Sequence, residues 1–352
     1  MNTLRVGFAG YGVVGKLRRN YVDNHPSFTT VAVSDRKLRE PGFLEDSVKA
    51  FPDYQELLKE ELDVLFVCLS NDVAAEATIA GLSRGLHVFC EKPPGKDLND
   101  IARVIECQKT HPELQLKYGF NHRYHDSVVE AFQLVQSGSL GKVINLRGVY
   151  GKSAIINFAS EWRTQRSIAG GGILLDQGIH MVDLMRLFAG EFEEVFSFVS
   201  NDYWNHDVED NAYAIMRTQD GIVAMLHSSA TQWQHRFNLE ITLQEGAISL
   251  SGLLTGTRSY GAETITIIHK SEQDSGMPME ISKRYTTDPS WEREIEEFSK
   301  AIINKEKVGY GSSEEALRTM QLVYKIYCAD KKWQSAYDLI DVAPEFSDLK
   351  DS

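Results

Sequence analysis

The chain lacks the cysteine patterns and long apolar runs of several protein classes. Its 352 residues include only four cysteines, Cys68, Cys90, Cys107 and Cys328, with no Cys-x-x-Cys pair. This spacing argues against a metal site or a disulfide framework, and we expect reduced thiols, with Cys68 and Cys90 as small buried residues. No window approaches the roughly 18 apolar residues of a membrane span, and the first residues show no signal-peptide pattern. We therefore expect a cytoplasmic protein that binds no metal and no membrane.

Clustered positive charge is also scarce. The chain carries 50 acidic and 37 basic residues, which gives a formal net charge of −13. Nucleic acids and anionic membranes favour clustered lysine and arginine, so we expect neither as a partner. One short basic run, residues 16–19, is expected to be a solvated helix face. The hydrophobic content of 42% is ordinary for globular cores, and the length suggests about two domains.

Two patterns of secondary structure follow each other along the chain. Over residues 1–121, short apolar runs alternate with helical segments, which predicts a doubly wound parallel sheet of the Rossmann type. Residues 54–61 are expected to be one of its helices. Between about 193 and 286, β-rich runs follow one another without long crossovers, which predicts a large, mostly antiparallel open sheet. We therefore predict an α/β protein with a nucleotide-binding domain over 1–121 and a second domain over 122–352.

Further helices are expected beyond the first domain. Their expected ranges are about 125–137, a segment that opens near Leu174, 291–304 and 313–329.

A glycine-rich turn joins the first expected strand to the first helix. Gly10, Gly12 and Gly15 form a Gly-x-Gly-x-x-Gly motif. Gly10 permits a tight turn, Gly12 lets the backbone approach a diphosphate, and Gly15 lets the helix pack closely on the strand. The diphosphate would lie at the positive end of the helix. The motif therefore predicts a dinucleotide cofactor.

The residues after the second expected strand bear on the choice of cofactor. Asp35 lies 20 residues after Gly15, where a carboxylate can accept hydrogen bonds from both ribose hydroxyls of NAD. Its charge disfavours a 2′-phosphate, whereas Arg36 and Lys37 could supply cations to one. We predict NAD, and NADP stays possible.

Two later segments carry candidate catalytic groups. Lys92 follows the fourth expected strand of the first domain, and parallel sheets bind ligands at the carboxyl ends of their strands. Asp176, His180 and Asp183 recur at helical spacing, so a helix would place them on one face. The ordinary pKa of histidine, about 6.5, suits proton exchange with a substrate hydroxyl at neutral pH. We expect Asp183 to be structural rather than reactive.

These motifs together resemble the Gfo/Idh/MocA family of oxidoreductases. The matching segments are the glycine turn with Asp35, residues 85–93 (GLHVFCEKP), residues 119–121 (GFN) with Arg123, residues 161–163 (EWR) and residues 170–183. The resemblance covers nearly the whole chain. It implies a Rossmann domain followed by an α/β domain that binds substrate and whose open sheet often mediates oligomer contacts. A homodimer or homotetramer is therefore expected.

The resemblance also implies roles for single residues. Lys92 would lie beside the nicotinamide and the substrate, Asp176 would orient the reacting hydroxyl, and His180 would be the acid/base. One loop departs from the family pattern, in which many relatives have Thr-Pro-Asn and then a histidine. This chain has Ser70, Asn71 and an aspartate there, with an alanine in place of the histidine.

Two sets of contacts follow from the motifs and the resemblance. The predicted cofactor contacts are Gly10, Tyr11, Gly12, Val13, Val14, Gly15, Asp35, Arg36, Ser70, Asn71, Glu91, Lys92 and Asn121. The predicted substrate contacts are Lys92, Arg123, Tyr150, Lys152, Trp162, Arg163, Asp176 and His180. An aromatic plane suits the apolar face of a sugar, and a guanidinium suits a phosphate or carboxylate.

The reaction implied by the resemblance is hydride transfer between a nicotinamide and a secondary alcohol or ketone. The substrate would be a sugar, an inositol or a nucleotide sugar. Two other functions stay open: an NAD-dependent glycosidase that recycles its cofactor, and a non-catalytic, ligand-sensing regulator. The presence of Lys92, Asp176 and His180 counts against the regulator. The sequence leaves open which sugar is used and in which direction the reaction runs.

Overall fold

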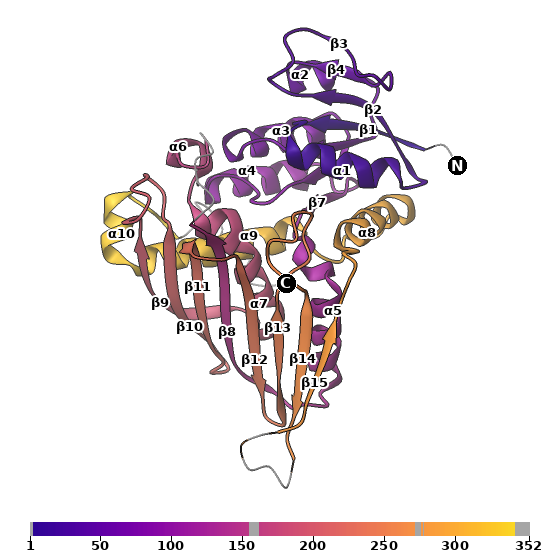
Figure 1. Ribbon diagram of the computed structural model, residues 1–352. Helices are drawn as coiled ribbons and strands as arrows, with labels where there is room; N and C mark the ends of the chain where they lie inside the picture. Colours follow the sequence, from indigo (N-terminus) through magenta and orange to yellow (C-terminus); the bar gives the residue numbers. More distant parts are fainter. Residues whose placement is uncertain (1–2, 155–161, 272–275, 277, 342–352) are drawn as a thin grey trace.

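The computed structural model describes residues 3–154, 162–271, 276 and 278–341. Figure 1 shows two sheets with their helices, the N-terminal sheet above and the C-terminal sheet below. No helix in the described ranges is both long and apolar enough to cross a membrane. The architecture is the predicted α/β fold with one parallel and one mostly antiparallel sheet.

The N-terminal sheet has seven strands within the described residues. Its order is β3-β4-β2-β1-β5-β6-β7, and its pairs are parallel except for β3 with β4. The strands are β1 (Leu4–Ala9), β2 (Phe28–Ser34), β3 (Gly42–Phe43), β4 (Lys49–Phe51), β5 (Val64–Val67), β6 (His87–Cys90) and β7 (Leu116–Tyr118). Their helices are α1 (Val13–Asp23), α2 (Tyr54–Leu57), α3 (Asn71–Ser83) and α4 (Leu98–Lys109). The strand order reverses between β1 and β5, which is where such sheets bind ligands.

Two local predictions for this domain need correction, and two short strands were not predicted. The strands β3 and β4 are only two and three residues long, too short to show alternation, and were not predicted. The helix expected over 54–61 is shortened to α2. The basic run at 16–19 is not a solvated face, because Arg18 has no exposed surface. Its guanidinium carbon lies 4.4 Å and 4.1 Å from the ring centroids of Phe89 and Trp291.

The C-terminal sheet has eight strands within the described residues. Its order is β15-β14-β13-β12-β8-β11-β10-β9, and only β8 with β11 is parallel. The strands are β8 (Val143–Ser153), β9 (Phe192–Ser200), β10 (Asn211–Thr218), β11 (Val223–Gln232), β12 (Arg236–Leu243), β13 (Gly246–Ser251), β14 (Thr264–His269) and β15 (Glu280–Arg284). The large, mostly antiparallel sheet is thus confirmed.

Helices cover one face of this sheet. The remaining helical elements are η1 (Asn121–Tyr124), α5 (Asp126–Ser137), α6 (Arg166–Ala169), η2 (Leu174–Gly178), α7 (Ile179–Ala189), α8 (Ser290–Asn304), α9 (Ser313–Ala329) and α10 (Lys331–Ala336). Figure 1 shows α5, α7 and α9 on the same side of the strands. The packing of α7 is close, since a β-carbon at Gly148 of β8 would lie 2.5 Å from Cε of Met185.

The end of the chain returns to the first sheet. Ile295, Phe298 and Ile302 of α8 share a hydrophobic core with Val6 and Phe8 of β1. Figure 1 shows α8 beside α1. By packing, therefore, α8 belongs with the N-terminal sheet although it follows the C-terminal sheet along the chain. The division of the chain at residue 121 stays a prediction.

Candidate active site

The glycine turn between β1 and α1 brings backbone segments very close together. Gly10 has φ +96°, and a β-carbon there would lie 2.3 Å from the carbonyl oxygen of Cys68. A β-carbon at Gly15 would lie 2.1 Å from the carbonyl oxygen of Gly10. At Gly12, by contrast, the position of the missing β-carbon has no atom within 4 Å, so the space above the turn is open.

The N-terminus of α1 faces this space without a side-chain cap from the described residues. Its first amides therefore keep their donors for a ligand, and the helix end favours an anion. Val13 is 87% exposed beside the turn, and the Tyr11 hydroxyl accepts a hydrogen bond from Arg19 of α1. The turn thus fits the diphosphate of a dinucleotide.

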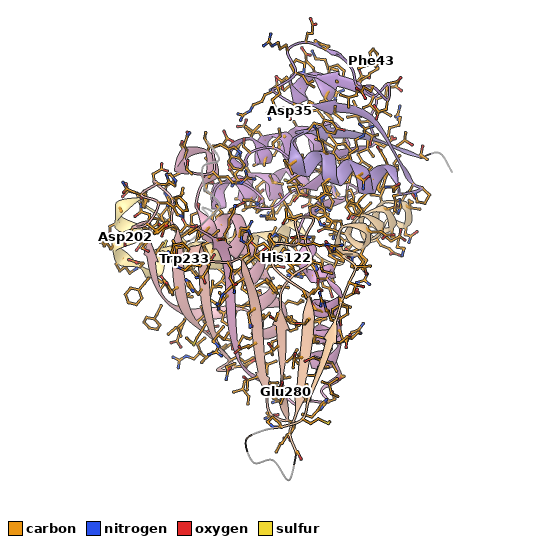
Figure 2. The ribbon with its side chains drawn as sticks, viewed as in Figure 1. Asp35, Phe43, His122, Asp202, Trp233 and Glu280 are labelled. Atoms are coloured by element: carbon orange, nitrogen blue, oxygen red, sulfur yellow. The ribbon has the colours of Figure 1, made fainter. Side chains whose placement is uncertain are left out.

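Asp35 directly follows β2, and Figure 2 labels it on the upper domain. Its Oδ1 accepts a hydrogen bond of 2.9 Å from the amide of Lys37, and Arg36 and Lys37 are exposed. The second carboxylate oxygen of Asp35 has no partner among the described contacts, so the position fits a ribose hydroxyl.

Four other predicted cofactor contacts lie at strand ends of the same sheet but use their side chains within the protein. Ser70 donates to Asp72, and Asn71 donates to the carbonyl oxygen of Ala169. Glu91 accepts from Arg18, and Asn121 donates to Ser290. Their contacts with a cofactor stay predictions.

Lys92, Asp176 and Arg163 converge at the carboxyl end of β6. Lys92 Nζ donates to the backbone carbonyl of Asp176 and lies 3.8 Å from its Oδ1. Arg163 Nε lies 3.6 Å from the same oxygen, and its guanidinium carbon is 4.3 Å from the Trp162 ring centroid. The peptide bond from Lys92 to Pro93 is cis. The first two of these side chains are largely buried, with 17% of Lys92 and 20% of Asp176 exposed.

Burial and neighbouring charge act in opposite directions on these groups. Burial lowers the pKa of Lys92 below its ordinary value of 10.5, although the carboxylates of Asp176 and Glu91 oppose this. Burial also acts to raise the pKa of Asp176, but the charges of Lys92, Arg163 and Lys152 outweigh it and hold that pKa below 3.8. Asp176 is therefore an anion held between cations.

The segment that leads into α7 explains how Asp176 is placed. Residues Leu174–Gly178 form a single π-helical turn, a wider turn that often occurs at functional sites. The buried carboxylate of Glu209 accepts hydrogen bonds from the amides of Gly172 (2.7 Å) and Leu174 (3.0 Å). A β-carbon at Gly172 would lie 2.0 Å from the Glu209 carbonyl oxygen, so the glycine run allows this close contact. Sequence reasoning missed Glu209, which lies far from the motif it supports.

His180 lies at the junction of the two domains, stacked on His122. The ring centroids are 3.7 Å apart and the planes differ by 12°. His122 is held in place by hydrogen bonds of 3.0 Å to the Tyr150 hydroxyl and 3.1 Å to the Asn121 side chain. Figure 2 labels His122 between the upper and lower sheets. His122 directly follows the GFN motif at residues 119–121, a signal that the sequence analysis did not use.

The pKa of His180 differs from the value expected from the sequence. Burial lowers this pKa well below 6.5, and the nearby His122 and Lys92 act in the same direction. Within the described residues, its Nδ1 is buried without a hydrogen-bond partner. The expectation of an unperturbed histidine is therefore wrong, and His180 is neutral at neutral pH.

Arg123 and Asp183 form a separate buried ion pair. Arg123 donates to both carboxylate oxygens of Asp183, at 2.7 Å and 2.6 Å, and to Glu315 of α9 at 2.5 Å. The structure does not bring Arg123 to the groups around Asp176, which corrects its predicted substrate contact. Asp183 likewise turns away from the helical face expected for it with Asp176, because the π turn changes the register. Its carboxylate holds Arg123, and the structural role expected for it stays a prediction.

The remaining predicted substrate contacts lie along β8 and next to Arg163. Tyr150 is almost fully buried and reaches His122, and Lys152 is the next residue on the same face of the strand. Trp162 lies under the Arg163 guanidinium, whereas Glu161 of the EWR motif lies outside the described residues.

Sequence reasoning missed the aromatic and amide groups next to them. Tyr260 donates to Gln177 at 2.7 Å, and its ring centroid lies 5.3 Å from that of Tyr150. The ring of His235 lies 4.7 Å from that of Tyr260. Tyr260 and His235 come from loops without a motif, so the sequence offered little signal for them, whereas Gln177 lies within the 170–183 segment.

Two surface hollows lie away from this cluster. One, of about 540 Å³, lies between α1 and α8 and is lined by residues such as Tyr21 and Glu292. The other, of about 320 Å³, lies on the outer face of β9, β10 and β11. Neither is lined by Lys92, Asp176 or His180, so the chemistry and not the size of a hollow identifies the candidate site.

The fold and the site together define a two-domain oxidoreductase with a dinucleotide-binding Rossmann domain. Residues 4–120 match the oxidoreductase family with an NAD-binding Rossmann fold, and residues 128–249 match the GFO/IDH/MocA C-terminal domain. The chain belongs to the Gfo/Idh/MocA family of oxidoreductases, as the sequence motifs implied.

Several characterised proteins are similar to this chain. Levoglucosan dehydrogenase from Pseudarthrobacter phenanthrenivorans is 28% identical over 57% of this chain and 55% of its own length. The match therefore spans about half of that relative. Myo-inositol 2-dehydrogenase from Thermotoga maritima is 28% identical over 64% of this chain and 68% of its own. The solved structure of a levoglucosan dehydrogenase in complex with NADH has a TM-score of 0.80 and 20% identity, and the match covers 94% of this chain and 98% of that chain. At that identity the likeness shows the fold.

Proposed function

We propose that the protein is an NAD(P)-dependent dehydrogenase or reductase that acts on a secondary alcohol or ketone of a sugar, an inositol or a nucleotide sugar. The observation that carries this proposal is the convergence of Lys92 on Asp176 next to His180. The charge of Lys92 helps to lower the pKa of the His180 imidazole. This cluster lies at the carboxyl end of β6, in the sheet that carries the open glycine turn. The names of the relatives support a sugar or polyol as substrate.

The chain's own residues would divide the chemistry as follows. The bound nicotinamide supplies hydride acceptance or donation. Lys92 stabilises the negative charge that develops on the substrate oxygen, and loss of such a donor costs roughly 100- to 1000-fold in rate. Asp176 holds the reacting hydroxyl in register. Because Nδ1 of His180 is fully buried, Nε2 is the ring atom left to exchange the proton.

NAD is the proposed cofactor, with NADP as the alternative. The Asp35 carboxylate favours free ribose hydroxyls, whereas the exposed Arg36 and Lys37 could bind a 2′-phosphate. The cytoplasmic location also stays a prediction.

We further propose that copies of the chain associate through the outer face of β9, β10 and β11. This face exposes a continuous group of apolar side chains: Phe196, Phe198, Tyr213, Ile215 and Met225. They are neighbours across the strands, since Phe198 pairs with Tyr213 and Ile215 pairs with Met225. Exposed apolar patches of this kind mark interaction sites. A homodimer or homotetramer would cover it.

The test is turnover by the purified protein with NAD or NADP and a panel of inositols, aldoses and nucleotide sugars. Absorbance of the reduced cofactor should rise with at least one of them. Lys92→Met should lower the rate by roughly 100-fold or more while the cofactor still binds, because the ammonium that stabilises the developing charge on the reacting oxygen is lost. Unchanged turnover would remove Lys92 from the mechanism.

Assays that also include glycosides and measure sugar release and ligand binding separate the two alternatives. Glycoside cleavage without net reduction of the cofactor would favour the recycling glycosidase. Ligand binding without any hydride transfer would favour the regulator.

A further inference from the structure

We propose that His122 is a positioning residue for the reaction: its ring holds the plane of the His180 imidazole so that Nε2 of His180 faces the substrate. This inference rests on the proposed oxidoreductase function and adds a residue to which the sequence motifs assign no role. His122 lies between the two sheets, on the helical turn η1 that comes shortly after β7 (Figure 2).

His180 lacks the hydrogen bond that usually orients a catalytic imidazole. In such sites one ring nitrogen exchanges the proton, and the other donates to a carboxylate or a carbonyl oxygen, which fixes the plane of the ring. In the part of the chain that the structure describes, the buried Nδ1 of His180 has no such partner. The plane of the ring is therefore fixed by something other than a hydrogen bond at this nitrogen.

Two aromatic contacts take the place of that hydrogen bond. The His122 ring is stacked on the His180 ring, with centroids 3.7 Å apart and planes that differ by 12°. The ring of Phe120 meets His180 at an angle of 84°, with centroids 6.3 Å apart. Rotation of the imidazole about its bond to the β-carbon would tilt it into the stacked ring, and a packed interior resists such a collision. The plane of His180 thus follows the plane of His122.

The plane of His122 is itself fixed at both edges of the ring. Oδ1 of Asn121 can only accept, so Nδ1 of His122 donates the hydrogen bond of 3.1 Å between them. Nε2 of His122 then carries the lone pair and accepts from the Tyr150 hydroxyl at 3.0 Å. Burial lowers the pKa of His122 well below 6.5, and His125 and Lys92 act in the same direction, so the ring is neutral. Both nitrogens are used within the protein, which favours a positioning role over proton exchange.

A buried ion pair holds the two helical elements at this spacing. Arg123 is next to His122 on η1, and Asp183 lies one turn after His180 on α7. The guanidinium of Arg123 donates to both carboxylate oxygens of Asp183, so the contact fixes direction as well as distance. The ion pair therefore keeps the two stacked rings against each other.

Two apolar substitutions separate a stacked plane from mere filling of space. His122→Phe keeps a flat ring against His180, whereas His122→Leu fills the place without one. We expect His122→Leu to lower kcat by about tenfold or more, because a misplaced acid/base group costs rate rather than binding. The kcat of His122→Phe should be at least about fivefold higher than that of His122→Leu, because only a flat ring keeps the stacked geometry. The dissociation constant of the cofactor, from fluorescence titration, should stay at the parent value in both.

The solvent isotope effect tests whether the proton step is the one affected. In His122→Leu, the ratio of kcat/KM in ordinary water to that in heavy water should rise above the parent ratio, because proton exchange then limits the rate more strongly. A loss of folded protein alone would leave this ratio unchanged. Nitrogen NMR of the histidine rings in the parent adds a readout without turnover: His122 should show one neutral form with the proton on Nδ1 between about pH 6 and 8.

His25→Phe and His25→Leu are the matched controls. Both ring nitrogens of His25 are also hydrogen-bonded, to Glu296 and to the amide of Ser27. Its ring also contacts an aromatic ring, that of Phe28, with centroids 5.2 Å apart. His25 lies just beyond the C-terminal end of α1, whereas the glycine turn lies at the other end of that helix. The two controls should therefore share the kcat and the isotope effect of the parent.

The outcomes separate this inference from the proposed function. Equal kcat values for His122→Leu and His122→Phe, or an isotope effect in His122→Leu that matches the parent, would overturn the inference and keep the dehydrogenase. NMR signals that place the proton of His122 on Nε2, or that show a charged ring, would also overturn it. Absence of hydride transfer by the parent with every inositol, aldose and nucleotide sugar of the panel would overturn the proposed function, and the inference with it.

Discussion

At the residue scale, the environment of His180 determines which form of the imidazole is present. The ring is buried and stacked on His122, and both effects disfavour a charged ring. His122 cannot accept the charge instead, because burial lowers its own pKa well below 6.5. The proposed base is therefore ready in its neutral form at neutral pH.

This state predicts a specific pH dependence. In the oxidation direction, kcat/KM should stay level as the pH falls from 8 to about 6.5 and should decline only below that value, because a lowered pKa keeps the base form to more acidic pH. His180→Asn should slow the reaction by roughly 100-fold or more and remove the acidic decline. Initial rates across the pH range measure both effects. A variant profile that matches the parent would assign the proton to another group.

A second prediction at this scale concerns the cofactor. Asp35→Ser should shift the ratio of kcat/KM for NAD over NADP toward NADP by about tenfold or more, because a carboxylate repels a 2′-phosphate and a hydroxyl does not. Asp53→Ser is a matched control. Asp53 lies directly before α2 and caps that helix, so its substitution should change stability rather than cofactor selectivity. Unchanged selectivity in Asp35→Ser would contradict the ribose assignment.

At the element scale, α8 joins the later part of the chain to the cofactor-binding sheet through buried charges. Arg18 of α1 donates from Nε to Glu91 at 2.5 Å, and its Nη2 lies 2.6 Å from Glu294 Oε2 of α8. The second contact is close but poorly directed, so it is an ion pair and not a hydrogen bond. Two carboxylates thus share one guanidinium. Burial raises the pKa of Glu294 to about 7, although Arg18 and Lys117 oppose this.

The raised pKa of Glu294 predicts how stability changes with pH. Its folded pKa of about 7 lies above the ordinary 4.5, so its contribution is complete below pH 4.5 and is lost as the pH rises to about 7. Glu294→Gln cannot ionise, so the variant should gain stability relative to the parent over this range, by up to about 3 kcal/mol. Thermal unfolding midpoints at several pH values between about 5 and 8 measure the difference.

Glu292→Gln is the control for this experiment, because Glu292 is an exposed residue of the same helix. It should show a constant difference from the parent across the range. A constant difference for Glu294→Gln as well would mean that Glu294 stays ionised in the folded protein.

The helix pattern of α8 shows what could be predicted at this scale. Trp291, Ile295, Phe298 and Ile302 repeat at helical spacing, and the helix was predicted nearly to its ends. Glu294 lies on the same face, so the spacing also implied its burial. Its partner could not be inferred, because Arg18 belongs to a basic run that looked like a solvated surface.

At the scale of the whole molecule, the uncovered face of the C-terminal sheet sets an expectation for assembly. Figure 1 shows α5, α7 and α9 on the other face of this sheet. The apolar side chains on β9, β10 and β11 would be covered by the same surface of a second copy, as in a closed symmetric dimer.

Phe198→Glu should therefore shift the protein toward the monomer. Burying such a side chain contributes about 2 kcal/mol, so we expect the dissociation constant to rise by roughly 30-fold or more. Light scattering after size exclusion measures the mass. Phe43→Glu is the control, because Phe43 is also largely exposed but lies on β3 of the other domain (Figure 2). A monomeric parent would contradict the proposed interface.

The sequence by itself determined the two kinds of sheet, the glycine turn and the residue types at the candidate site. These features depend on local periodicity and on steric needs of single residues, as at Gly10 and Gly15, and such needs can be read from neighbouring letters. Lys92 could be placed for the same reason, because the end of a parallel strand is a defined position.

Only the tertiary structure decided which of these groups meet. It paired Arg123 with Asp183 away from the site, stacked His122 on His180, and placed Arg163 and Lys92 against one oxygen of Asp176. The physical reason is that burial and charge act through space. A pKa or an ion pair depends on atoms that come close only when distant segments of the chain pack together.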